Sequence, residues 1–82
     1  MNENIAQPLA SYITEIILKQ PRRVLQPGDA LISSGMIDSL SLVDLALFVE
    51  DTFGVRIDDT ELNTETFDTF QQLVELIQQR QA

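Results

Sequence analysis

Apolar residues recur every three or four positions between residues 4 and 19, which is the spacing of one face of an α-helix. Asn4 can cap this helix and Pro8 then falls in its first turn, where a missing N–H costs least, although the helix can instead begin nearer Pro8. Gln20–Pro21 ends it, because the residue before a proline is disfavoured in a helix. We therefore predict a first helix over 4–19, whose apolar positions are Ile5, Leu9, Tyr12, Ile13, Ile16 and Ile17.

The segment from residue 39 to residue 53 is apolar on nearly every side of a helix and ends at Gly54, a typical left-handed C-cap residue. Its apolar residues are Leu40, Leu42, Val43, Leu45, Ala46, Leu47, Phe48, Val49 and Phe53. One helix of a small domain cannot bury every face, so we expect part of this surface to be exposed. An exposed apolar stripe bordered by acidic residues is typical of a docking surface.

The connection between these two helices, residues 20–37, is long for a small domain, and long connections are often functional. Its apolar residues predict that it is held against the core; they are Leu25, Leu31, Ile32 and Ile37. Lys19, Arg22 and Arg23 at its start fit a solvated helix C-terminus, which the helix dipole favours.

Two further helices are predicted after a short extended segment at residues 55–57. Residues 58–68 are polar and indicate a turn with a short helix, anchored by Leu62 and Phe67. Asp68 or Thr69 then caps a last helix that runs to about residue 80. The buried side of this last helix holds Phe70, Leu73, Val74, Leu76 and Ile77.

These elements predict one domain over residues 1–82, with no internal repeat. The fold class is all-α: a small four-helix bundle of three longer helices and one short helix.

Composition excludes several classes of function. The chain has no cysteine and no histidine, which removes thiol catalysis, disulfides, most zinc sites and the usual neutral-pH base. No apolar run approaches the ~20 residues of a membrane span and the first residues do not resemble a signal peptide, so we expect a cytoplasmic protein with no membrane partner. A net charge of −8 argues against nucleic acid and favours partners with basic patches.

The Asp38-Ser39 step at the start of the second helix is the strongest candidate for chemistry. Simple N-capping explains either residue taken alone. However, Ile37 and Leu40 are too apolar for a merely solvated cap, and Gly35 marks a bend just upstream. Ser39 has no base beside it and lies at the positive end of a helix dipole, where a phosphodiester would be stabilised. We therefore predict that another enzyme modifies Ser39, and that the protein is not itself an enzyme.

Three segments of the chain closely resemble the acyl carrier protein family, which includes peptidyl and aminoacyl carriers. They are Gly35-Met36-Ile37-Asp38-Ser39-Leu40, then Val43-Asp44-Leu45, and then Phe53-Gly54-Val55-Arg56-Ile57-Asp58. The resemblance covers nearly the whole chain and is tightest from Leu31 to Phe70. It implies that Ser39 receives 4′-phosphopantetheine from coenzyme A, with Asp38 as the adjacent acid. It further implies that an acyl or aminoacyl group is carried as a thioester on this arm, in fatty acid, polyketide, nonribosomal peptide or related biosynthesis.

The resemblance also implies which residues meet partner proteins. Leu40, Val43 and Leu47 take the exposed apolar positions of the second helix, and Asp44, Glu50 and Asp51 are the acids that meet basic docking patches. The implied partners are a phosphopantetheinyl transferase, an acyl- or aminoacyl-loading ligase, and downstream synthases and transferases. We expect a monomer. Leu45, Phe48, Val49 and Phe53 are then expected in the core.

Two departures point to a specialised, discrete carrier. Carriers of fatty acid synthesis usually have a small residue before Asp-Ser-Leu and an acid two residues after the serine, whereas this chain has Met36-Ile37 and Ser41. If Phe48, Phe53, Phe67 and Phe70 fill the interior, little room is left for a long chain, so we expect a short or polar cargo.

Two alternatives come from other classes. A small acidic helical interaction module would use the same apolar stripe without a prosthetic group. A metal-binding loop at Asp58, Asp59 and Glu61 lacks the alternating acids, central glycine and terminal glutamate of a calcium loop, so we expect no dedicated metal site.

Overall fold

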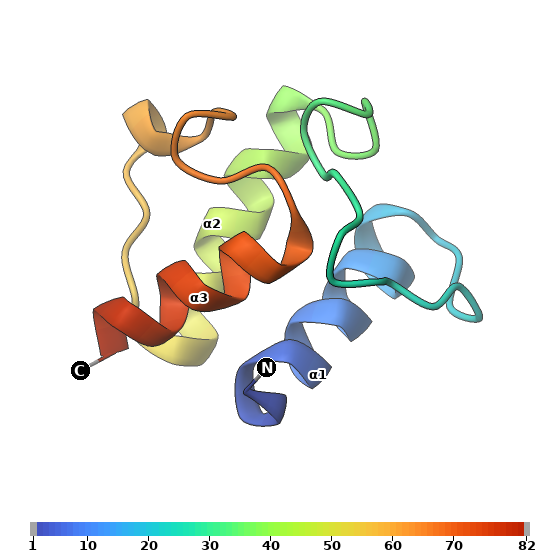
Figure 1. Ribbon diagram of the computed structural model, residues 1–82, viewed down its shortest axis with the longest axis horizontal. Coiled ribbons are helices and arrows are strands. Elements are labelled where there is room, and N and C mark those ends of the chain that lie inside the picture. Colours follow the sequence, from blue (N-terminus) through green and yellow to red (C-terminus); the bar gives the residue numbers. More distant parts are fainter. Residues whose placement is uncertain (1, 82) are drawn as a thin grey trace.

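The computed structural model describes residues 2–81, and in this part of the chain all regular elements are helical apart from an isolated bridge between Ala30 and Thr69 (Figure 1). The elements in chain order are α1 (Glu3–Ser11), the π-helix η1 (Tyr12–Ile17), α2 (Ser39–Phe53), the 3-10 helix η2 (Asp59–Glu61) and α3 (Phe70–Gln81). Helix α3 packs against both α1 and α2. The predicted all-α fold, with three longer helical runs and one short helix, is confirmed. No helix within these residues is long and apolar enough to cross a bilayer.

The first helix begins earlier than the sequence predicts. Its cap is Asn2, whose side-chain oxygen accepts from the Asn4 N–H at 3.0 Å, so the prediction that Asn4 is the cap is wrong. Pro8 consequently lies inside α1 rather than in its first turn, and the Asn4 carbonyl cannot receive the usual bond from residue 8.

The second half of the first helical run is a π-helix, which the sequence pattern did not reveal. The Thr14 hydroxyl donates to the Ala10 carbonyl at 3.0 Å, which satisfies this buried side chain. Because a π turn holds more residues than an α turn, side chains shift around the axis, and Ile16 is 60% exposed instead of buried. The run ends at Ile17, and Lys19 adopts a left-handed φ of 56°, so the turn precedes Gln20–Pro21.

Helices α2 and α3 follow the predicted bounds closely. Gly54 ends α2 with a φ of 69°, and its N–H bonds to the Glu50 carbonyl at 3.0 Å. At the start of α3, the Thr69 hydroxyl accepts from the Gln72 N–H at 3.2 Å, and the Gln72 side chain accepts from the N–H groups of Asp68 and Thr69. This reciprocal arrangement is a capping box, so Thr69 rather than Asp68 is the cap.

The core lies between the three longer helices and the connection of residues 20–37. Leu31 and Ile37 are fully buried, which confirms that this connection is held against the core. On α2 the buried residues are Leu42, Leu45, Ala46 and Val49.

Phe48 and Phe53 are only partly buried, so their assignment to the core is wrong. They lie at the edge of the buried stripe of α2, where Phe48 stacks on Tyr12 with ring centroids 4.1 Å apart and Phe53 meets Phe48 edge-on at 6.0 Å. The interior positions are taken by Phe67 and Phe70 instead.

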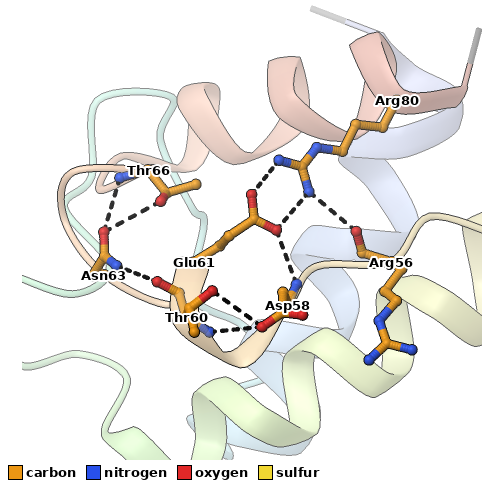
Figure 2. A network of polar contacts seen from close by, with 7 residues as sticks. All are labelled: Arg56, Asp58, Thr60, Glu61, Asn63, Thr66 and Arg80. Carbon is orange, nitrogen blue, oxygen red and sulfur yellow. Dashed lines mark hydrogen bonds and ion pairs between the residues drawn. The ribbon is translucent and has the colours of Figure 1, made fainter.

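The acidic segment after α2 is held by its own hydrogen bonds (Figure 2). Asp58 caps η2, and Glu61 completes this box by accepting from the Asp58 N–H at 3.0 Å. Glu61 also forms an ion pair with Arg80 of α3, whose guanidinium donates to the Arg56 carbonyl at 3.1 Å. The carboxylates of Asp58 and Glu61 are therefore engaged as caps and as an ion-pair partner.

The Glu61–Arg80 pair predicts an acid-sensitive contribution to stability. Its hydrogen bonds from Arg80, then from the Asp58 N–H, lower the pKa of Glu61 from 4.5 to about 2. Because the folded-state pKa is depressed, the stabilisation is present above about pH 4.5 and is lost as the pH falls towards 2. We expect the difference in Tm between the wild type and Glu61→Gln to shrink over this range. Glu75→Gln is the control, since it removes an exposed carboxylate of α3 without touching Arg80; an equal pH trend in both variants would contradict the assignment.

Gly54 offers a second test of the fold. Alanine at a left-handed position costs about 1–2 kcal/mol, so we expect Gly54→Ala to lower the free energy of unfolding by about 1 kcal/mol. Gly28 has open space around its Cβ position and no left-handed φ, so Gly28→Ala should change stability by less than about 0.5 kcal/mol. Denaturant titration of the two variants measures both values, and equal values would refute the role of the left-handed cap.

Candidate functional site

Asp38 and Ser39 occupy different positions at the start of α2. Asp38 is the N-cap, with extended backbone, and its carboxylate accepts from the Ser41 N–H at 2.8 Å. Hydrogen bonds from the Ser41 N–H and hydroxyl, and from the Leu40 N–H, hold the pKa of Asp38 below its usual value. Asp38 thus takes the capping role as an ionised group, which leaves the next residue, Ser39, without that role.

Ser39 is the first residue of α2 and is exposed. Among residues 2–81, no side-chain hydrogen bond found in the structure involves its hydroxyl, whereas Ser33, Ser34 and Ser41 each contact neighbouring groups. A phosphodiester on this hydroxyl would lie at the positive end of a 15-residue helix, where a negative charge is stabilised. The site therefore fits a covalently attached phosphate group, and it places no base beside the serine.

The loop that leads to Ser39 is closed by its own hydrogen bonds. The Ile37 N–H donates to the Leu31 carbonyl and the Gly35 N–H to the Ile32 carbonyl, both at 3.0 Å. Gly35 has a φ of 77°, a conformation that glycine adopts at little cost. Ile37 is buried, so the residue just before Asp38 is fixed in the core.

Asp68 is a residue of this region that the sequence analysis considered only as a cap. Its carboxylate accepts from the N–H groups of Ile32 at 3.1 Å and Ser33 at 2.9 Å, and from the Ser33 hydroxyl at 2.6 Å. The Thr69-x-x-Gln72 pattern was the available signal, because it assigns the cap to Thr69 and leaves Asp68 for another role.

One side of α2 carries the apolar residues named from the resemblance. Leu40, Val43 and Leu47 are 80%, 42% and 57% exposed. The three acids are exposed on the same helix: Asp44, Glu50 and Asp51. We call these six residues the α2 face.

A shallow groove of about 220 Å³ borders this face, between α2 and the segment that follows it. Its lining includes Val43 and Leu47 from α2 and also Arg56 and Asp59. Arg56 was not singled out by the sequence analysis, and it places a positive charge beside an otherwise acidic surface.

Comparison with known proteins identifies the family. A family model described as the phosphopantetheine attachment site matches residues 11–77, which contain α2, η2 and most of α3. An acyl carrier protein of Coprothermobacter proteolyticus is 32% identical over 76 residues, covering 93% of this chain and 89% of the relative. The meromycolate extension acyl carrier protein of Mycolicibacterium smegmatis is 38% identical over 60 residues, covering 73% of this chain but only 60% of that relative's length.

These matches agree with the helical fold, and the residues matched by the family model include Ser39. The chain therefore belongs to the acyl carrier protein family, whose members hold 4′-phosphopantetheine covalently and act as carriers of acyl groups rather than as catalysts.

Proposed function

We propose that Ser39 is the attachment residue for 4′-phosphopantetheine, and that the chain carries an acyl or aminoacyl group as a thioester between partner enzymes. The observation that carries this proposal is the exposed Ser39 at the first position of α2, beside the ionised cap Asp38. When bound, the arm supplies the thiol that the cysteine-free chain lacks.

The residues around Ser39 have separate tasks in this proposal. In the transfer the Ser39 oxygen would form a bond to the phosphorus of the arm and its hydroxyl proton would pass to the transferase, while the diphosphate bond of coenzyme A would break and adenosine bisphosphate would leave. The positive end of α2 stabilises the resulting phosphodiester. Asp38 keeps the first turn of α2 ordered, because its carboxylate accepts a hydrogen bond from the Ser41 N–H. The same carboxylate lies next to Ser39, where it could interact with a metal ion bound by the transferase.

We infer that the α2 face is the surface that partners recognise. Leu40, Val43 and Leu47 supply a small apolar contact, and the three acids favour partners with basic patches. An acidic rim accelerates encounter more than it tightens binding, which suits a carrier that must leave each partner quickly. The expected partners are the phosphopantetheinyl transferase, a loading ligase and the synthases or transferases that use the cargo.

The cargo is proposed to be short or polar. Phe67 and Phe70 occupy the interior, which supports this proposal, whereas Phe48 and Phe53 lie at the edge of the core and contribute nothing to it. The Ile37-Asp38-Ser39-Leu40 sequence favours a specialised pathway over primary fatty acid synthesis. The alternative of an interaction module without a prosthetic group is opposed by the family match.

Attachment at Ser39 is tested by intact mass after incubation with coenzyme A, magnesium and a broad-specificity phosphopantetheinyl transferase. We expect the wild type to gain the mass of one phosphopantetheine and Ser39→Ala to gain none. Ser41→Ala, two residues further along α2, is the matched control and should still be modified. The proposal would be refuted by a transferase that modifies a known carrier but not this chain. Modification of Ser39→Ala would show that the arm is attached at another residue.

The α2 face is tested by charge reversal. Reversing a rim charge mainly slows encounter, so we expect Asp44→Lys to lower kcat/KM for the transferase by about threefold to tenfold at low salt, and by less at high salt. Glu75→Lys on α3 is the control, because it makes the same change in net charge away from this face. An equal loss in both variants would show that only net charge matters.

A further inference from the structure

Asp68, in the segment before α3, holds a part of the chain that lies far from it in sequence. Its carboxylate accepts from the N–H groups of Ile32 and Ser33 at 3.1 and 2.9 Å and from the Ser33 hydroxyl at 2.6 Å. Its backbone carbonyl accepts from the Leu31 N–H at 2.6 Å. Four hydrogen bonds from three consecutive residues therefore converge on one aspartate. We call this arrangement the Asp68 clip.

A continuous path of contacts leads from the clip to Ser39. The Leu31 carbonyl accepts from the Ile37 N–H at 3.0 Å, which closes the loop of residues 31–37. Ile37 is 2% exposed, so its side chain is fixed in the core. The next residue, Asp38, caps α2, and Ser39 follows it directly. A shift of residues 31–33 would thus be passed to the backbone that sets the direction of Ser39.

The Asp68 carboxylate is available for this task because another residue caps α3. Thr69 and Gln72 form the capping box, so the side chain of Asp68 is not needed at the helix start. Hydrogen bonds from Ser33 to the Asp68 carboxylate hold the pKa of Asp68 below its usual value, so these bonds favour its ionised form. Hydrogen bonds to an ionised acceptor are stronger than neutral ones.

We propose that Asp68 is a positioning residue for the modification of Ser39: by fixing residues 31–33 it holds the loop that presents Ser39 to the phosphopantetheinyl transferase. This inference rests on the proposed function, namely that Ser39 receives the arm. It assigns to the segment before α3 a part in a reaction that takes place at the start of α2. The α2 face shares no residue with the Asp68 clip. A change in the clip should therefore alter how Ser39 is presented to the transferase without altering how the transferase recognises the α2 face.

The test compares steady-state kinetics of transfer with coenzyme A, magnesium and a broad-specificity transferase, with the carrier as the varied substrate. Asp68→Ala removes the three side-chain bonds and should lower kcat by about tenfold, because a small misplacement of a reacting group has a large effect on rate. Asp68→Asn keeps an oxygen acceptor for the two N–H groups, and its amide N–H can donate to the Ser33 hydroxyl in place of the bond that the hydroxyl donates in the wild type, so it should restore kcat to within about threefold of the wild type. Ser33→Ala, which removes one bond, should fall between them.

Loss of stability alone has a different kinetic signature. Partial unfolding reduces the concentration of competent carrier, which raises the apparent KM and leaves kcat unchanged. Gln72→Ala is the matched control, since it breaks the capping box at the same helix start without touching residues 31–33. We expect it to lower Tm while leaving kcat near the wild-type value.

Amide hydrogen exchange gives a second readout. Asp68→Ala should speed exchange at the Ser33 and Ile37 N–H groups more than at α3, and Gln72→Ala should not. The proposal is overturned if folded Asp68→Ala keeps the wild-type kcat, if Gln72→Ala lowers kcat equally, or if Asp68→Asn gives no rescue. A wild type that is not modified at all would instead refute the attachment proposal, so the two failures are distinguishable.

Discussion

The connection between the first two helical runs has no regular element of its own, and it is held both by its buried Leu31 and Ile37 and by hydrogen bonds to the start of α3. The Phe70 N–H donates to the Asp29 carbonyl at 3.0 Å and the Gln71 N–H to the Pro27 carbonyl at 2.9 Å. These two N–H groups belong to the first turn of α3, where a helix has no internal partner for them. The same bonds therefore complete α3 and hold the connection, and the position of Ser39 at the end of that connection depends in part on them.

The apolar residues of α2 lie in three different environments. Leu45 and Val49 face the core, Phe48 stacks on Tyr12 at the edge between η1 and α2, and Leu40 and Leu47 remain exposed. If the exposed positions of α2 were polar, the side of α2 that faces the core could pack equally well. Leu40 and Leu47 leave most of their apolar surface exposed, which is the physical reason for proposing that they contact transient partners.

The sequence was sufficient for several features that depend on neighbouring residues, although the same local rules placed the cap of α1 at Asn4 instead of Asn2. The bounds of α2, its left-handed Gly54 and its N-terminal cap at Asp38-Ser39 all follow from local rules. The π-helix was missed because its bonds reach one residue further than those of an α-helix, and no residue type marks that choice. Its presence turned Ile16 outward, against the simple helical pattern. Asp68 was missed as an anchor of the loop because its partners at Ile32 and Ser33 are distant in the sequence and can be known only from the fold.

The stacked pair of Tyr12 and Phe48 has a practical consequence for the study of this carrier. The chain holds one tyrosine and no tryptophan, so its intrinsic ultraviolet emission comes from Tyr12. That ring lies against α2, and its hydroxyl donates to the Asp44 carbonyl at 3.4 Å, next to the acids of the α2 face. The fluorescence of Tyr12 therefore reports on the contact between η1 and α2, and it can be followed without a label while a partner or a cargo is added.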